Sequence, residues 1–252
     1  MKKRCFIAGA GEYTGLVSPL PGDYVIAADG GYAQLVSRGI VPDLVIGDFD
    51  SLGEAPDHPN IVRSPAEKDD TDMMLAVREG LSRGLGMFII DGGLDGRLDH
   101  TIANFQILVY LARRGALGVL LGREVCVTAI TNGSLKFYSG RENTKAALKR
   151  GDIADAADTE MRCGVSADSS NSAMRGGISV FSAGEAAEGV TLAGLKYPLD
   201  GATITCDYPI GVSNEFTGTP ATVSVRSGAL LVTWTSGPEL LEGMYEVLEW
   251  TS

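Results

Sequence analysis

The chain has 252 residues, of which 44% are hydrophobic and 21% are charged, and its formal net charge at pH 7 is −11. This composition indicates a globular protein of one or two domains that can bury a core, and it excludes a wholly disordered protein. The sequence has no basic run that would bind a phosphate backbone, which argues against a nucleic-acid-binding protein.

The N-terminus resembles a signal peptide only over its apolar run, Cys5 to Ala10. A cleavable segment needs about 7–15 apolar residues, so we expect a first β-strand here instead. No segment reaches the roughly 18 apolar residues of a membrane span. We therefore expect a cytoplasmic protein with no membrane partner and no nucleic-acid partner.

The first half of the chain alternates short apolar runs with helical patterns. Runs bounded by Gly, Pro or Asp predict strands over Arg4–Ala8, Tyr24–Ala28, Leu44–Ile46, Ile61–Arg63, Met87–Ile90 and Val119–Leu121. Apolar residues at helical spacing predict helices over Thr71–Arg83 and Asp99–Arg114. This alternation predicts an α/β domain over residues 1–135, with a mostly parallel sheet and helices on both faces.

The second half of the chain differs in composition and in apolar pattern. Residues 146–176 are rich in Ala, Ser, Asp and Gly without a periodic apolar pattern, and we interpret residues 136–176 as a linker or insertion. Short strand-like runs follow at Ile178–Phe181, Val190–Leu192, Thr203–Cys206, Ala221–Val225 and Leu230–Trp234. They predict a small all-β sandwich over residues 177–252, in which Glu239–Trp250 forms a short helix or a strand.

Acidic residues follow several predicted strands of the first half. Asp29 ends one strand, Asp48 and Asp50 follow the next, and Asp91 ends a later one. Ligands of open α/β sheets bind at the carboxyl ends of the strands, so these acids are expected at the ligand-binding edge. Gly residues follow Asp29 and Asp91, and Gly allows a backbone to approach a ligand closely.

Further acids stand where the two predicted helices begin. Asp69 and Asp72 precede the first helix and Asp99 begins the second, and each alone is explained by a helix N-terminus, which favours acids. Helix N-termini do not explain the cluster as a whole, because carboxylates that lie close together repel one another unless a cation lies among them. Oxygen ligands of this kind suit Mg²⁺ with a phosphorylated substrate. Lys68 and Arg97 supply cations for the phosphates.

Other functions remain open at this point. The turn Gly9–Gly15 has the spacing G-x-G-x-x-x-G, a weak match to the dinucleotide fingerprint of a nicotinamide-dependent oxidoreductase. That reading leaves the acidic cluster unexplained, and binding of NADH without Mg-ATP would support it. Near the second helix start, His100 either binds a phosphate or lies on the surface.

The ordered motifs of the chain resemble the thiamine pyrophosphokinase family over most of its length outside residues 140–185. They are Ala28-Asp-Gly-Gly31, Gly39-Ile-Val-Pro-Asp43, Ile46-Gly-Asp-Phe-Asp-Ser51, Lys68-Asp-Asp-Thr-Asp72, Gly92-Gly-Leu-Asp-Gly-Arg-Leu-Asp-His100, Gly194-Leu-Lys-Tyr-Pro-Leu199, Gly211-Val-Ser-Asn-Glu-Phe216 and Gly228-Ala-Leu-Leu-Val232. The chain departs from the family's pattern at Asp95, where members often have Gly.

The resemblance implies an activity and an assembly. Family members transfer the pyrophosphoryl group of ATP to the hydroxyl of thiamine, and the products are thiamine diphosphate and AMP. They have an ATP-handling α/β domain and a thiamine-binding β-sandwich. They act as homodimers whose active sites are shared between subunits, with Mg²⁺ bound. A non-catalytic thiamine or nucleotide sensor is an alternative, against which the presence of Asp48, Asp50, Asp72 and Arg97 argues.

The resemblance also implies roles for residues. The metal ligands are Asp48, Asp50 and Asp72. The nucleotide-binding residues are Asp29, Gly30, Lys68, Asp69, Arg97 and His100. The thiamine-binding residues are Ser213 and Asn214. The catalytic residues are Asp72, Asp99 and Arg97, and either Asp99 or Asp72 could accept the proton of the thiamine hydroxyl. Trp234 could stack on thiamine but is expected to be buried in the sandwich.

Overall fold

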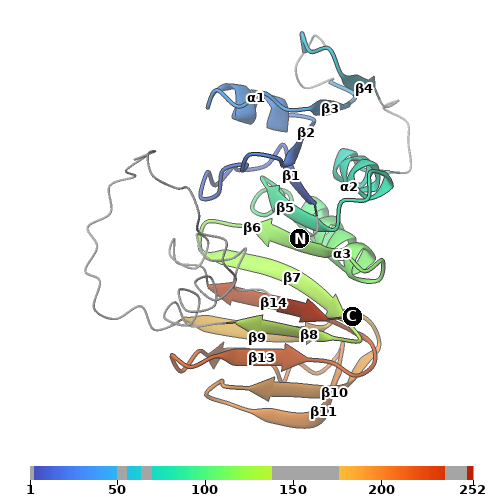
Figure 1. The fold of residues 1–252 in the computed structure, drawn as a ribbon. Coiled ribbons are helices and arrows are strands. Elements are labelled where there is room, and N and C mark those ends of the chain that lie inside the picture. The colour runs from blue at the N-terminus through green and yellow to red at the C-terminus, as the bar shows by residue number, and fades with distance from the viewer. Residues whose placement is uncertain (1–2, 50–55, 64–69, 138–175, 236–248, 252) are drawn as a thin grey trace, which may run out of the picture.

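The computed structural model describes residues 3–49, 56–63, 70–137, 176–235 and 249–251, which form two β-sheets and three helices (Figure 1). The helices are α1 (Gly31–Val36), α2 (Asp72–Ser82) and α3 (Leu98–Ala112). No helix within these ranges has the length and hydropathy that a membrane span requires.

The larger sheet has ten strands in the order β12-β9-β14-β7-β6-β5-β1-β2-β3-β4. Its parallel part consists of β1 (Arg4–Ala8), β2 (Tyr24–Ala28), β3 (Leu44–Gly47), β4 (Ile61–Arg63), β5 (Met87–Asp91) and β6 (Leu117–Leu121). Its antiparallel part consists of β7 (Val125–Thr131), β9 (Gly177–Ser182), β12 (Asn214–Glu215) and β14 (Ala229–Thr235).

The smaller sheet is antiparallel and has five strands in the order β11-β10-β13-β8-β15. Its strands are β8 (Ser134–Phe137), β10 (Ala186–Ala193), β11 (Leu199–Thr205), β13 (Ala221–Ser224) and β15 (Glu249–Thr251). It packs against the antiparallel end of the larger sheet, at the bottom of Figure 1. Trp234 of β14 lies between the two layers, 2% exposed, with its ring 5.5 Å from that of Phe137. Trp234 is therefore a core residue, as expected.

The predicted fold class is confirmed in part. The runs that predicted strands in the first half all form strands, and the antiparallel strands follow them. Strands β1 to β6 are parallel, as expected for the first half. The complete sheet is mixed, because β7 pairs antiparallel with β6, and β14, β9 and β12 extend the sheet further. The division at residues 135 and 177 stays a prediction, and most of the predicted insertion, residues 138–175, lies outside the described residues.

Side chains of the larger sheet alternate between two hydrophobic cores. In β1, Cys5 and Ile7 pack with α2 and α3 on one face, whereas Phe6 and Ala8 face the core that contains Leu35 of α1. The same second core continues into the space between the two sheets. A strand buried on both faces has no polar alternation, which is why β1 reads as a continuous apolar run.

A single side chain, that of Thr71, determines where α2 begins. The Thr71 hydroxyl accepts a hydrogen bond from the Met74 N–H at 3.1 Å, which caps the helix. Asp72 lies in the first turn, where a carboxylate is stabilised by the helix dipole. The N-termini of α2 and α3 both face the carboxyl ends of the parallel strands, so the residues of these turns meet at one edge of the sheet.

Candidate active site

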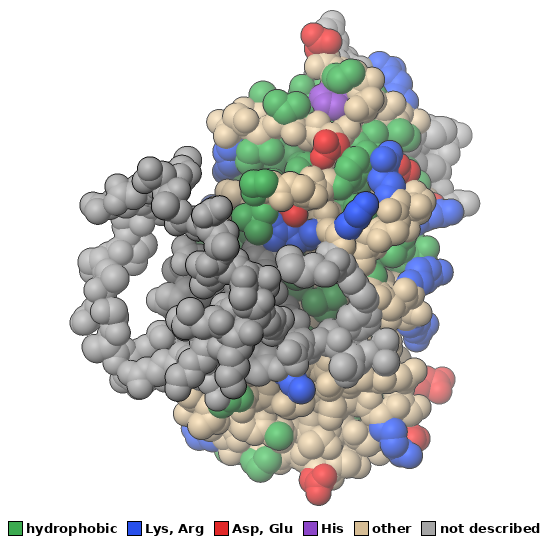
Figure 2. Space-filling model, viewed as in Figure 1, with side chains coloured by type: hydrophobic (Ala, Val, Ile, Leu, Met, Phe, Trp, Pro, Cys, Tyr) green, Lys and Arg blue, Asp and Glu red, His purple; other side chains and the backbone are tan. Residues whose placement is uncertain are grey.

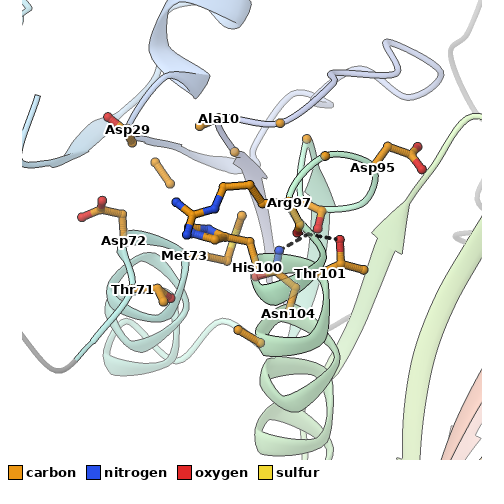
Figure 3. Close-up of a pocket in the computed structure, with 17 residues that line it drawn as sticks. Ala10, Asp29, Thr71, Asp72, Met73, Asp95, Arg97, His100, Thr101 and Asn104 are labelled. Atoms are coloured by element: carbon orange, nitrogen blue, oxygen red, sulfur yellow. Dashed lines mark hydrogen bonds between the residues drawn. The ribbon is translucent and has the colours of Figure 1, made fainter. Parts of the chain in front are cut away.

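A cavity of about 400 Å³ lies at the carboxyl ends of β1, β2 and β5. Its wall comes from the loops after these strands and from the first turns of α2 and α3. Figure 3 shows Asp29 and Asp72 on one side of the cavity and Asp95 on the other, with Arg97 extending into the space between them. The position and volume are those of a small-molecule site in an open α/β sheet.

Two loops of the cavity wall touch backbone to backbone. The Gly11 N–H donates to the Gly92 carbonyl at 2.8 Å, and the Gly9 N–H donates to the Asp91 carbonyl at 2.7 Å. A Cβ atom on Gly9 or Gly11 would lie only 2.6 Å from the Gly92 carbonyl oxygen, and Gly92 itself has a φ of +76°. Glycine is required at these positions because a side chain would separate the loops.

The same turn is a poor dinucleotide site. The Gly9–Gly15 segment leads from β1 to β2 without a helix between them. A dinucleotide fold binds the pyrophosphate at the N-terminus of the helix that follows such a turn. The Gly11 N–H is also already bonded to Gly92. The turn therefore serves as a wall of the cavity, a role that its sequence pattern alone did not reveal.

The buried carboxylate of Asp91 holds the Gly9–Gly15 turn in place through hydrogen bonds. Its Oδ1 accepts from the Thr14 N–H at 2.7 Å, and its Oδ2 accepts from the Thr14 hydroxyl at 2.8 Å and the Gly15 N–H at 3.2 Å. The residue is 0% exposed. Burial raises the pKa of Asp91, and hydrogen bonds from Thr14, Gly15 and Gly92 oppose that rise. Asp91 thus ends β5 as expected but positions a loop instead of facing a ligand.

The loop between β5 and α3 presents its backbone to the cavity. Gly92, Asp95 and Gly96 have φ angles of +76°, +61° and +130°. Successive residues with unusual backbone angles create concave groups of N–H donors that suit anions. Buried Asn104 of α3 fixes the loop, because its amide donates to the Gly93 carbonyl at 2.6 Å. The residues Gly92, Gly93, Asp95 and Gly96 of this loop all line the cavity.

The acids predicted as metal ligands are only partly brought together. Asp72 lines the cavity, whereas Asp48 follows the strand β3 and Asp50 lies outside the described residues. Asp29, which is predicted to bind the nucleotide, also lines the cavity. Asp29 adopts a φ of +50° and its N–H donates to the Ile46 carbonyl at 2.7 Å, which ties the ends of β2 and β3 together. Within the described ranges, no group of three or more His, Cys, Asp or Glu residues is arranged to hold a metal ion.

Arg97 and Asp99 form an ion pair at the start of α3. The Arg97 guanidinium donates to both carboxylate oxygens of Asp99, at 3.2 and 2.6 Å, and the pKa of Asp99 is lowered by this contact. Arg97 and His100 line the cavity, whereas Asp99 does not. The expectation that Asp99 shares one crevice with the other acids therefore needs correction, because its partner is the adjacent arginine.

Charged side chains of both signs surround α2 and α3. Figure 2 shows Lys and Arg side chains together with Asp and Glu side chains on the upper part of the visible face. The exposed Arg78, Arg83 and Arg97 form ion pairs with Asp70, Glu79 and Asp99, which offset their positive charge. The predicted nucleotide-binding residues Lys68 and Asp69 lie outside the described residues, and Gly30 lies beside Asp29 at the N-cap of α1.

The predicted thiamine-binding residues lie on β12 and the loop before it. Asn214 is buried, and its side-chain oxygen accepts from the Tyr197 and Glu215 N–H groups, both at 2.9 Å. Its amide nitrogen donates to the Tyr197 carbonyl at 2.6 Å. Ser213 is exposed with a φ of +59°. Asn214 therefore holds two loops together, while Ser213 presents its side chain to the outside.

We predict that Asp91→Asn changes the pH dependence of stability. Because the pKa of Asp91 is raised in the folded state, the folded protein keeps a proton that the unfolded chain loses above about pH 3.9. The unfolding free energy of the wild type should fall, relative to that of Asp91→Asn, as pH rises from about 4 toward the raised pKa. Urea unfolding at several pH values measures this difference. If the wild type instead became more stable relative to Asp91→Asn as pH rises, the raised pKa of Asp91 would be contradicted. Asp200→Asn is the control for removal of a surface carboxylate.

Asn214→Ala should destabilise the protein by about 1–3 kcal/mol, because the Tyr197 and Glu215 N–H groups lose the buried side-chain oxygen that accepts from both. Ser213→Ala, at the neighbouring exposed position, should change the unfolding free energy by less than about 0.5 kcal/mol. Denaturant unfolding of both variants is the measurement. Equal small effects would mean that Asn214 does not hold the two loops.

Comparison with known proteins places both halves of the chain in one family. Residues 21–119 match the family model described as "Thiamin pyrophosphokinase, catalytic domain", and residues 164–230 match "Thiamin pyrophosphokinase, vitamin B1 binding domain". The two matches together span about two thirds of the chain. They include most of the cavity wall and the strand that carries Asn214.

Individual relatives agree. The chain is similar to the thiamine pyrophosphokinase of Bacillus subtilis, with 27% identity over 82% of this chain and 85% of the relative. It is similar to thiamin pyrophosphokinase 1 of Caenorhabditis elegans, with 24% identity over 83% and 77% of the two chains. The crystal structure of the Bacillus subtilis protein has the same fold, with a TM-score of 0.70, 21% identity and coverage of 93% and 100%. The chain therefore belongs to the thiamine pyrophosphokinase family.

Proposed function

We propose that this protein transfers the pyrophosphoryl group of ATP to the hydroxyl of thiamine and releases thiamine diphosphate and AMP. The observation that carries the proposal is the cavity, in which Asp29, Asp72 and Arg97 share one space with a glycine-rich loop. Acids, a cationic clamp and backbone donors are the components of phosphoryl-type transfer. Family membership supports the choice of thiamine and ATP as substrates.

The nucleotide phosphates bind between the glycine-rich loop and the first turns of α2 and α3. Arg97 contacts them through its guanidinium, which suits a phosphate because it donates two parallel hydrogen bonds. His100 lines the same wall one turn away. Asp29 lines the cavity after β2, and we assign it to the nucleotide side together with the adjacent Gly30 and with Lys68 and Asp69.

A divalent metal fits the donor set of this site. Asp48, Asp50 and Asp72 offer the carboxylate oxygens that Mg²⁺ prefers, and we propose them as its ligands. Asp72 lines the cavity from the start of α2. When bound, Mg²⁺ neutralises negative charge on the triphosphate.

The two candidate proton acceptors differ in their surroundings. Asp99 is paired with Arg97, and its lowered pKa makes it a weaker base. We therefore assign Asp99 the role of orienting the Arg97 guanidinium toward the phosphates. Asp72 lines the cavity and is the carboxylate that we propose to face the reacting hydroxyl.

Thiamine is proposed to bind at the Ser213–Asn214 loop. The geometry of the sheet supports an active site formed by two subunits, with the loop of one beside the cavity of the other. β12 is separated from β5 by four strands, so the loop and the cavity of one chain are about 24 Å apart across the sheet. Thiamine is too short to join them. A homodimer that places this loop beside the partner's cavity removes the gap, with Asn214 holding the loop and Ser213 facing the substrate.

The first test measures AMP and thiamine diphosphate formed from ATP, thiamine and Mg²⁺. Asp72→Asn should lower kcat by about 100-fold or more, because it removes charge that acts on the transferred phosphates. Asp200→Asn carries the same change on an exposed strand and should keep normal turnover. Absence of AMP with the wild type would reject the function, and normal turnover of Asp72→Asn would reject its role.

The second test asks whether the site is shared. Asp72→Asn removes the phosphate side and Ser213→Arg blocks the thiamine side, so each variant alone should have little activity. Mixed dimers of the two contain one intact site, and an equal mixture should recover about a quarter of wild-type activity. Activity that stays at the level of the separate variants would contradict a shared site.

A further inference from the structure

A second cavity of about 230 Å³ lies between α2 and α3 and meets the first. Thr71 and Ala103 line both cavities, so they mark the junction at the first turns of the two helices. The α2–α3 groove, as we call it, runs from this junction along the helices to Tyr110. None of the roles assigned above uses it.

The walls of the groove are mainly apolar. Met74 of α2 and Ile107 of α3 provide aliphatic and thioether surface. Tyr110 closes the groove with an aromatic ring, and the guanidinium of Arg114 lies over that ring, 3.4 Å from its centroid. This contact holds the ring in a defined orientation. An apolar slot with a fixed aromatic wall suits a flat heterocycle.

The polar groups of the groove suit a neutral ligand with a hydrogen-bonding edge. Gln106 is exposed at the groove, and its carboxamide offers both a donor and an acceptor. Asp70 also lines the groove, but its carboxylate accepts a 2.6 Å hydrogen bond from Arg78. The acid is thus already paired with a cation, which makes the groove a poor match for the cationic ring of thiamine.

We propose that the α2–α3 groove binds the base of the nucleoside triphosphate, with Gln106 contacting the edge of a purine. This inference rests on the proposed function, which puts the triphosphate in the first cavity. In a nucleotide, a ribose joins the flat base to the phosphates. The groove would hold the base, the first cavity would hold the phosphates, and the ribose would lie at their junction, near Thr71 and Ala103. The groove then determines which nucleotide the enzyme accepts.

The test compares ligands that do and do not have a base. Binding of ATP, GTP and inorganic tripolyphosphate, each with Mg²⁺, is measured on the full chain by calorimetry, independently of turnover. Gln106→Ala should weaken ATP binding about 5-fold or more and reduce the preference between ATP and GTP. Ala103→Leu fills the junction and should weaken ATP binding by about 10-fold. Neither variant should change tripolyphosphate binding by more than 2-fold.

Gln34→Ala is the matched control, because Gln34 lies on α1, outside the groove, and should leave all three affinities unchanged. Parallel losses for ATP and tripolyphosphate would overturn the proposal, since they would indicate damage to the phosphate cavity. Unchanged ATP binding in Gln106→Ala and Ala103→Leu, or a wild type that binds tripolyphosphate as tightly as ATP, would overturn it as well. A wild type that binds ATP through its base but forms no AMP would reject the proposed function alone.

Discussion

The close contact between the loop after β1 and the loop after β5 is the constraint on which the site depends. Gly9, Gly11 and Gly92 approach so closely that no side chain fits between the loops. Asp91, buried below them, gathers the Thr14 and Gly15 N–H groups onto one carboxylate. This part of the cavity wall is therefore formed by two backbone segments that hydrogen-bond to each other. The charged side chains around it project from a backbone whose position is already fixed.

Much of the fold could be predicted because its signals are local. Continuous apolar runs such as Arg4–Ala8 identified buried strands, and the apolar spacing after Thr71 identified α2. The short helix α1 and the strands β7 and β8 were missed. α1 has only six residues. The run Val125–Thr131 is followed by Asn132-Gly133, a turn signal between β7 and β8 that could have identified both strands. The joining of both halves in one sheet could not be seen, because strand pairing is non-local.

The site was predictable in its location but less so in its contacts. The acid at the end of a predicted strand and the acid at the start of a predicted helix, Asp29 and Asp72, both line the cavity. The pairing of Asp99 with Arg97, the burial of Asn214 and the loop-holding role of Asp91 depend on which group each side chain meets, and composition does not encode that. Asn104 and Thr101 line the cavity from positions that the helical pattern alone treats as ordinary α3 residues.

The continuous sheet has a consequence for how the molecule can be divided. α3 packs on β6 and also on β7 and β14, so one helix covers both the parallel and the antiparallel strands. Cutting the chain after β6 would leave that helix half uncovered and would expose the buried strand Leu117–Leu121 as a free edge. The N-terminal half is therefore not an independent folding unit: an expressed fragment ending near residue 121 would lack the neighbours that keep it folded and soluble.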